Sequence, residues 1–174
     1  PLGRRLYIEE DEFKVEQPKK YFRMFPGNEV RWMNAYFVKG TGGVKDENGN
    51  VVEVHGTYDP ASKGGNSTDG RKVKGTIHWV AARTAVTVEC RLYENIVDEE
   101  KGKLNEDGSL NLNPNSLTII KNCYVEPALA EAKPYDSYQF VRNGFFCADC
   151  KDSTPEHLVF NRIVSLKSSF KIAK

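Results

Sequence analysis

The stretch GRKVKGTIHWV, residues 70–80, joins a cluster of positive charge to strict alternation. Its basic side chains stand within four residues, and small or apolar residues then alternate with polar ones. A period of two is typical of a strand with one buried face, because successive side chains point to opposite sides of a sheet. We therefore predict a strand that begins with the cations Arg71, Lys72 and Lys74. One face would carry Val73, Gly75, Ile77 and Trp79, and the other Lys72, Lys74, Thr76 and His78.

Similar strand patterns recur along the chain, separated by turn signals. Asn48-Gly49 predicts a hairpin with a type I′ turn, because both central residues of that turn have positive φ. Asp69-Gly70 marks a turn before the opening stretch, and Asn143-Gly144 predicts a second tight hairpin. A short helix is expected over 126–133, starting near Pro127. Frequent short strands between turns predict an all-β barrel or sandwich. The expected strands cover 29–39, 51–59, 72–80, 85–93, 116–125, 137–149 (as a hairpin) and 158–166.

Residues 98–111, DEEKGKLNEDGSLN, are polar, acidic and glycine-containing, without the periodicity of a core element. We interpret them as a linker or a long loop. The break suggests that the chain folds as two units.

The overall composition indicates a globular chain without a membrane segment. Of 174 residues, 39% are hydrophobic and 28% are charged. No apolar run approaches the ~20 residues that a membrane helix needs, and the start, PLGRRLYIEE, lacks the apolar stretch of a secretory signal. The chain begins at Pro1 without Met, which suggests a fragment of a longer protein. We expect a cytoplasmic protein with no membrane partner.

Four cysteines, at 90, 123, 147 and 150, raise the question of a metal site. Cys147 and Cys150 form a CxxC pair that could be half of a zinc site. A structural zinc normally takes four ligands, and the other half is missing because Cys90 and Cys123 are isolated. We therefore expect free cysteines in a reducing cytoplasm, and no metal.

Charge is unevenly distributed along the chain. Residues 19–91 carry 12 basic and 7 acidic side chains, a balance of +5, and the rest carries 13 basic and 17 acidic, a balance of −4; together these give the net charge of +1. A basic middle between acidic ends suits a chain that contacts an anion with one part only.

The sequence shows no self-contained catalytic motif. His55, His78 and His157 lie outside any HExxH pattern, and no GxxxxGK[ST] loop is present. A binding module is therefore favoured. Cations interleaved with aromatic rings are typical of single-stranded RNA binding, although a solvated basic face over core aromatics explains the same pattern equally well. The cations are Lys19, Lys20, Arg23, Arg31, Arg71, Lys72 and Lys74, and the aromatic residues are Tyr21, Phe22, Trp32 and Tyr36.

Seven segments together resemble the C-terminal anticodon-binding region of glutaminyl-tRNA synthetases, in the order found in that family. The resemblance covers residues 5–166, and residues 71–80 are its most specific part. The segments are GNEVRWMNAY (27–36), HGTYDPASKGGNSTDGRKVKGTIHWV (55–80), RLYENI (91–96), NPNSL (113–117), VEPAL (125–129), QFVRNGFFCADCKDS (139–153) and VFNRIVSL (159–166).

The resemblance implies a parent enzyme that joins glutamine to its tRNA and uses ATP and Mg in an upstream catalytic domain. The HIGH-like and KMSK-like motifs of that domain are absent from this sequence. The chain itself is therefore expected to hold no cofactor and to be inactive alone. The implied fold is two antiparallel β-barrels with at most short helices. A distal barrel of residues 19–97 would be inserted into a proximal barrel of residues 1–18 plus 98–174.

The resemblance also implies residue roles in reading the anticodon of tRNA(Gln). Arg23 and Arg31 match arginines that engage the anticodon in a bacterial member. Gln139 and Arg142 match a glutamine and an arginine that contact the middle base and its surroundings. Lys19 and Lys20 lie near the family's basic cluster at the barrel junction, and Asn34 completes the predicted set.

Two residues depart from the pattern of that bacterial member. Met33 replaces a second arginine of an Arg-x-Arg pair, and Val141 replaces a glutamate, so contacts made there by charge are lost. Lys72 and Lys74 are interpreted as a general electrostatic surface near RNA, or equally as a solvated edge that deters strand pairing.

Three alternatives stay open from sequence alone. The first is a glutamyl-tRNA synthetase with the same barrels. The second is a stand-alone barrel of the kind that binds 5S rRNA in ribosomes, although such proteins have one barrel and not two. The third is a protein-interaction module without an RNA role, whose partner binding would be insensitive to salt. We expect a monomer that binds tRNA(Gln).

Overall fold

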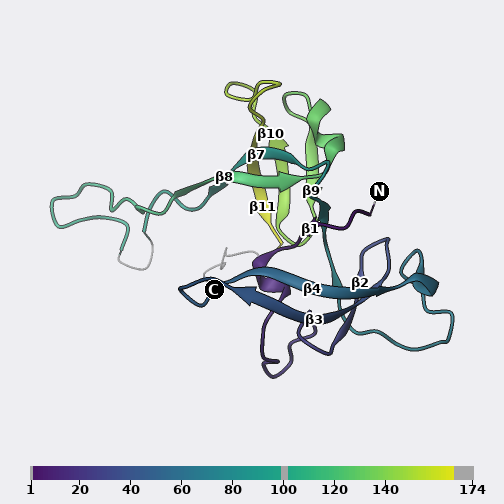
Figure 1. The fold of residues 1–174 in the computed structure, drawn as a ribbon. Helices are drawn as coiled ribbons and strands as arrows, with labels where there is room; N and C mark the ends of the chain where they lie inside the picture. Colours follow the sequence, from purple (N-terminus) through teal and green to yellow (C-terminus); the bar gives the residue numbers. More distant parts are fainter. Residues whose placement is uncertain (1, 99–101, 167–174) are drawn as a thin grey trace. The chain divides into compact units, whose positions relative to one another are not determined.

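A computed structural model describes residues 2–98 and 102–166 (Figure 1). The described residues form strands and three short 3-10 helices, so the predicted all-β class with at most short helices is confirmed. The chain separates into two compact units, Pro1–Arg83 and Thr84–Lys174, called the first and the second unit below. The helices are η1 (Glu10–Glu12), η2 (Pro60–Ser62) and η3 (Pro127–Glu131).

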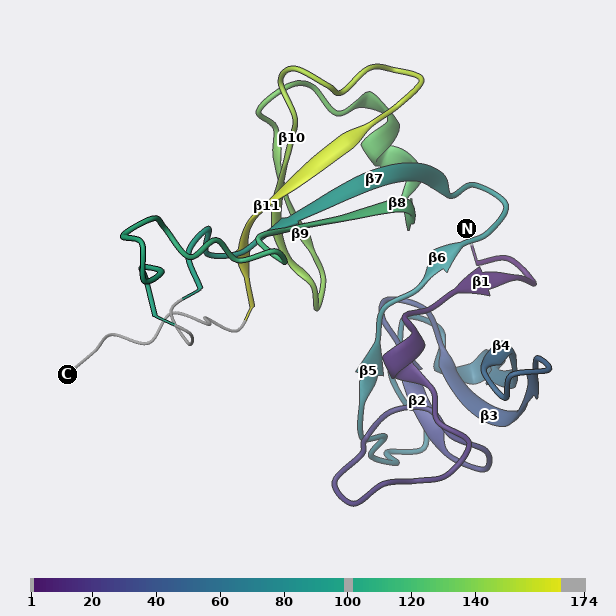
Figure 2. The same ribbon diagram turned by 90° about the vertical axis from the view of Figure 1, so that its left-hand side faces the viewer.

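The first unit is built on a four-stranded sheet in the order β4-β3-β2-β5 (Figure 2). The β2–β3 and β3–β4 pairs are antiparallel, whereas β2 and β5 pair in parallel, a feature that the expectation of antiparallel barrels did not include. A separate two-stranded ladder joins β1 to β6. The strands are β1 (Leu6–Tyr7), β2 (Glu29–Trp32), β3 (Phe37–Lys45), β4 (Val51–Asp59), β5 (Thr76–Ile77) and β6 (Val80–Ala81).

A core of apolar side chains fills the first unit. Ile77, from the opening stretch, is fully buried in it, as the alternation predicts. Phe13 and Met24, which precede the sheet in the chain, are joined by an isolated β-bridge and close this core. Its buried members are Phe13, Met24, Val30, Val38 and Ile77.

The opening stretch is less regular than its alternation suggests. Lys72 and Lys74 are exposed as predicted, but regular strand is confined to β5 and β6. The reason lies at Gly75, whose φ of +89° takes the backbone out of the extended region. A Cβ there would lie 1.8 Å from the carbonyl oxygen of Phe22, so the chain passes that segment at a distance that only glycine allows.

The hairpin predicted at Asn48-Gly49 is confirmed, but its turn type is not. Gly49 has a φ of +86°, whereas Asn48 is not among the described residues with positive φ, so the turn is not type I′. Instead the Asp46 carboxylate accepts hydrogen bonds from the backbone N–H groups of Asn48 and Asn50 at 3.0 and 2.8 Å. A local side chain therefore decides the turn, as aspartate often does.

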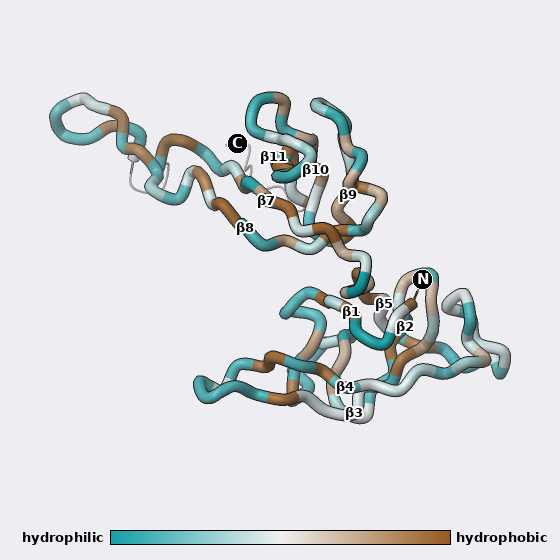
Figure 3. Tube along the Cα trace, turned by 45° about the horizontal axis from the view of Figure 1, so that its top comes forward, coloured by the Kyte–Doolittle hydropathy of each residue, from teal (hydrophilic) through white to brown (hydrophobic). Residues whose placement is uncertain are grey.

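The second unit is a five-stranded sheet in the order β8-β7-β11-β10-β9. Its β7–β11 pair is parallel and its other pairs are antiparallel. Hydrophobic positions recur along β7 and β8 between polar ones (Figure 3). The strands are β7 (Val86–Tyr93), β8 (Leu117–Val125), β9 (Ser137–Phe140), β10 (Gly144–Ala148) and β11 (Val159–Ser165).

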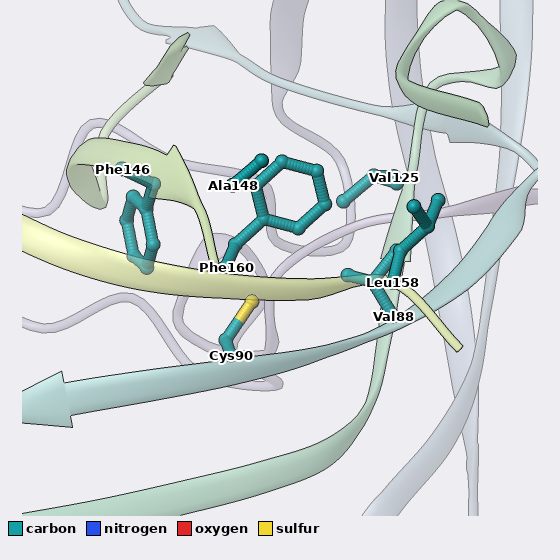
Figure 4. Close-up of a cluster of buried hydrophobic side chains, with 7 residues drawn as sticks. All are labelled: Val88, Cys90, Val125, Phe146, Ala148, Leu158 and Phe160. Atoms are coloured by element: carbon teal, nitrogen blue, oxygen red, sulfur yellow. The ribbon is translucent and has the colours of Figure 1, made fainter. Parts of the chain in front are cut away.

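One cluster of buried residues forms the core of the second unit (Figure 4). Phe160 is fully buried at its centre and lies 5.4 Å from Phe140, ring centroid to ring centroid. Phe140 stacks in turn on Phe146 at 4.4 Å. These contacts fix β9 and β10, the strands that carry the predicted middle-base hairpin.

The polar stretch 98–111 lies within the second unit, in the long connection between β7 and β8. Bridges between Val97 and Leu112 and between Leu104 and Leu110 make it an extended hairpin arm, and residues 99–101 lie outside the described residues. The compact units change over between Arg83 and Thr84. The proposed insertion of residues 19–97 between residues 1–18 and 98–174 stays a prediction.

Candidate nucleic-acid interface

Arg31, on β2, is a half-buried cation, and among residues 2–98 and 102–166 no carboxylate forms an ion pair with it. In the sheet register it stands opposite Phe37 of β3 and Thr76 of β5. Its guanidinium carbon lies 5.4 Å from the centroid of the buried Phe37 ring. Its Nε is buried and finds no acceptor among the described residues. Buried donors are nearly always satisfied, so an unsatisfied one on a guanidinium that lies over a ring makes Arg31 a candidate binding residue.

Arg71, the first cation of the opening stretch, differs from Arg31 because carboxylates bind its guanidinium. Its guanidinium carbon lies 5.2 Å from the same Phe37 ring. Its Nε donates to Glu29 at 2.9 Å, and its Nη1 and Nη2 bind Asp69 and Asp59. Three carboxylates saturate this side chain, so Arg71 does not belong to a free basic surface.

The pKa values around Arg71 reflect these contacts. Hydrogen bonds to the three carboxylates raise the pKa of Arg71 further above its ordinary range. The hydrogen bond from Arg71 lowers the pKa of Asp59. Hydrogen bonds from Ser67 and then from Arg71 lower the pKa of Asp69 to about 2. Arg71, Asp59 and Asp69 therefore stay ionised at neutral pH.

One lysine of the opening stretch, Lys74, lies over an exposed aromatic ring. Lys74 Nζ lies 5.7 Å from the centroid of the Phe22 ring, and 53% of Phe22 is exposed. Next to it, Lys14 Nζ lies 5.8 Å from the centroid of Tyr21. Exposed rings beside cations can stack on unpaired bases and contact phosphates.

Arg23, a predicted anticodon residue, has a structural partner. Its Nη1 donates to both carboxylate oxygens of Glu12, at 2.8 and 2.7 Å. Glu12 is buried, with 3% of its side chain exposed. Burial raises the pKa of Glu12, and Arg23 opposes that rise. Arg23 thus compensates a buried charge, and its contact with an anticodon stays a prediction.

Three predicted site residues share an uncommon backbone conformation. Lys20, Asn34 and Arg142 have φ values of +62°, +55° and +73°. Among the non-glycine residues that the structure describes, only Tyr135 joins them. All three are exposed and stand in turns, where the backbone aims the side chain outward. Such conformations concentrate at binding sites, although turns also hold them for structural reasons.

The turns of the first unit are held by specific hydrogen bonds. Ala35 N donates to Trp32 O at 2.9 Å across the turn that carries Asn34. The indole of Trp79 donates to Met33 O at 3.0 Å, and its ring stacks on Trp32 at 6.4 Å between centroids. Lys19 and Lys20 lie in an exposed turn closed by Tyr21 N donating to Pro18 O at 3.2 Å.

The second unit presents Gln139 and Arg142 on its β9–β10 hairpin. Gln139 is exposed on β9, opposite Phe145 of β10. The hairpin predicted here is confirmed, but Arg142 and not Asn143 takes the positive φ. The loop closes when Asn143 N donates to Phe140 O at 2.9 Å. The structure thus groups the predicted residues within each unit: Lys19, Lys20, Arg23, Arg31 and Asn34 in the first, and Gln139 and Arg142 in the second.

No sequence pattern indicated the group of side chains around Phe37. Phe37 reads as an ordinary core residue, and its role beneath two guanidinium groups depends on pairing between strands that are distant in sequence. Glu29, Asp59 and Asp69 read as scattered surface acids, because only the fold brings them to Arg71.

Cys147 lies on β10 and Cys150 follows it, and both are free. Within residues 2–98 and 102–166, no group of three or more His, Cys, Asp or Glu side chains is placed to hold a metal ion. In the same part of the chain, no helix has the length and apolar character needed to cross a membrane.

Comparisons with known proteins place the chain in a family. Two family models, each described as tRNA synthetases class I (E and Q), anti-codon binding domain, match residues 1–59 and 76–149. A glutamine–tRNA ligase of Clostridioides difficile is 56% identical over all of this chain and 32% of its own length. One of Clostridium kluyveri is 53% identical over 99% of this chain, and one of Pseudomonas putida 45% identical over 98%.

This chain spans about a third of the length of these relatives, 32% of the first. The sequence resemblance to their anticodon-binding region is confirmed. The chain belongs to the anticodon-binding domains of the class I tRNA synthetases of the E and Q type.

Proposed function

We propose that this chain binds the anticodon loop of tRNA(Gln) as part of a glutamine–tRNA ligase. The observation that carries the proposal is Arg31, a half-buried guanidinium stacked on Phe37 with an Nε that lacks an acceptor. A phosphate or a base edge of a splayed loop supplies the missing acceptor. The names of the relatives support glutamine as the amino acid.

Other groups extend this surface in each unit. In the first, Lys20 and Asn34 present exposed side chains from turns with positive φ, and Lys74 lies over Phe22. In the second, Gln139 and Arg142 are offered by the β9–β10 hairpin, and we assign them to the middle base. Gln139 supplies both a donor and an acceptor in one plane, the pattern that discriminates between base edges.

The assembled region would comprise a distal barrel of residues 19–97 and a proximal barrel of residues 1–18 plus 98–174. The parent enzyme would act in the cytoplasm as a monomer and take ATP and Mg in its catalytic domain. We assign no residue of this chain to those groups. The chain's own task is to hold the loop and to leave the chemistry to the rest of the enzyme.

Replacing Arg31 with Ala should weaken binding of an anticodon stem-loop by about 1–3 kcal/mol, the value of a bidentate contact. Fluorescence anisotropy with a labelled RNA measures it. Arg4→Ala and Arg5→Ala are the controls, because both residues are exposed at the start of the chain and we expect little effect from them. Unchanged affinity for Arg31→Ala, with the fold intact by circular dichroism, would remove Arg31 from the site.

A further inference from the structure

We infer that Arg71 is a positioning residue, which keeps the Arg31 guanidinium unpaired by holding the carboxylates that compete for it. The use of that free guanidinium rests on the proposed function. The effect of Arg71 on the Arg31 guanidinium does not depend on that function, because it involves only residues of the first unit.

Two acidic residues share the sheet face that carries Arg31. Glu29 and Arg31 are two residues apart on β2, so their side chains leave the same face roughly 7 Å apart. Asp59 stands opposite Phe37, which in turn stands opposite Arg31, so the three form a row across β4, β3 and β2. Arg31 therefore lies on a face that also carries two carboxylates.

These acids bind Arg71 instead of Arg31. Arg71 binds Glu29 through two nitrogens, Nε to Oε2 at 2.9 Å and Nη2 to Oε1 at 3.1 Å. The same Nη2 binds Asp59, and Nη1 binds Asp69. Such fork-shaped contacts use the planar donor set of arginine, which a lysine cannot reproduce.

A chain of contacts also links Arg71 to the aliphatic part of the Arg31 side chain. Asp59, besides binding Arg71, accepts from Ala61 N at 2.9 Å and so begins η2. Ser62 of η2 accepts from Phe37 N at 2.7 Å, which fixes the segment that follows. That segment places Gly65 where a Cβ would lie 3.3 Å from Cγ and Cδ of Arg31. The same network therefore shapes the space beside the Arg31 side chain.

Removal of Arg71 leaves its three carboxylates without their arginine, and the nearest cations in the sheet register are Arg31 on β2 and Lys39, which stands opposite Glu29 on β3. Glu29, on the same strand face, is the carboxylate best placed to bind Arg31. The expected consequence of Arg71→Met is an Arg31–Glu29 ion pair that hides the guanidinium from RNA. Arg71→Met/Glu29→Gln removes the competitor and should release Arg31 again.

The test uses the 174-residue chain, the anticodon stem-loop with CUG, and two salt concentrations. We expect Arg71→Met to weaken binding about tenfold and to change the salt slope only as Arg31→Ala does, since the Arg31 contact is the one that both variants lose. We expect Arg71→Met/Glu29→Gln to bind within about twofold of Glu29→Gln alone, since the carboxylate on the same strand as Arg31 is then absent. A slope that falls by about one contact more than in Arg31→Ala would make Arg71 a phosphate ligand and overturn the inference. Loss of binding without rescue by Glu29→Gln would overturn it as well.

A second readout does not need RNA. In arginine side-chain NMR, the Nε–H signal of Arg31 should shift in Arg71→Met and return in Arg71→Met/Glu29→Gln. An Arg31 Nε–H signal that is the same in wild type and in both variants would contradict the Arg31–Glu29 ion pair. If wild type fails to bind RNA, the proposed function fails, while the NMR comparison still decides the role of Arg71. Urea titration shows whether Arg71→Met is folded. If it is not, Arg71→Lys is tested instead, with and without Glu29→Gln, and we expect a smaller loss of RNA affinity and the same rescue.

Discussion

Replacing Arg23 with Met should lower the free energy of unfolding of the first unit by about 3–5 kcal/mol, because it strands a buried charge. Glu12, which has 3% of its side chain exposed, receives both hydrogen bonds from Arg23 Nη1. Without Arg23, burial and then the nearby charges of Glu9 and Asp11 still raise the pKa of Glu12, and the opposing influence of Arg23 is lost. Urea unfolding followed by tryptophan fluorescence measures the loss.

The loss should depend on pH in a defined direction. A carboxyl whose pKa is raised in the folded state binds more protons folded than unfolded, so its contribution to stability is present at low pH and is lost as pH rises through the folded pKa. The pKa of Glu12 already lies above its ordinary value of 4.5. The deficit of Arg23→Met should therefore shrink between pH about 7.5 and about 5.

The matched control is Glu12→Gln/Arg23→Met, which should recover most of the stability because no charge is left buried. If Arg23→Met stays as stable as wild type and loses only RNA affinity, the structural role is wrong and Arg23 is a direct RNA ligand. If both properties fall, the pH series separates them, since only the stability term follows Glu12.

Replacing Gly75 with Ala should destabilise the first unit by roughly 2–6 kcal/mol, through backbone strain and steric overlap together. The φ of Gly75 is +89°, and an added Cβ would lie 1.8 Å from the carbonyl oxygen of Phe22. That oxygen is backbone and cannot rotate away. Gly75 O also accepts from Arg31 N at 3.0 Å, so any shift moves the strand that holds Arg31. Thermal or urea unfolding gives the magnitude.

Gly70 provides a matched control five residues earlier. Its φ of +75° is similar, but nothing lies within 4 Å of an added Cβ. Gly70→Ala should therefore cost only about 1 kcal/mol, the conformational part. Equal losses at the two positions would mean that the contact with Phe22 is unimportant.

Sequence reasoning predicted the fold class because the alternation was strong. The hairpins at 46–50 and 140–144 also followed from local residues. Ile77 was placed correctly because its period-two neighbours set the buried face. The type of the turn at Asn48-Gly49 was predicted wrongly, since a hydrogen bond from Asn48 N to the Asp46 side chain decides it, which the Asn-Gly pair does not reveal.

The site was only partly accessible from sequence. Resemblance selected Arg31, but the orphaned Nε and the Phe37 platform depend on strand pairing. Charge counting treated Arg71 as one more cation, whereas the fold surrounds it with carboxylates from β2, β4 and the loop before it. Arg31 and Arg71 lie beside the same Phe37 ring, but only Arg71 is bound by carboxylates. This difference comes from contacts between residues that are distant in sequence, so no short sequence segment reveals it.

The most direct test of the account is binding of this chain to two anticodon stem-loops, one with CUG and one with its middle U changed to A, at two salt concentrations. We predict a preference for CUG and a steep loss of affinity with salt, since bases are read while phosphates are neutralised. Gln139→Ala should abolish the preference, and Ser137→Ala, also exposed on β9, should keep it. Equal affinity for the two RNAs, or affinity that ignores salt, would contradict the proposal that this chain reads the anticodon.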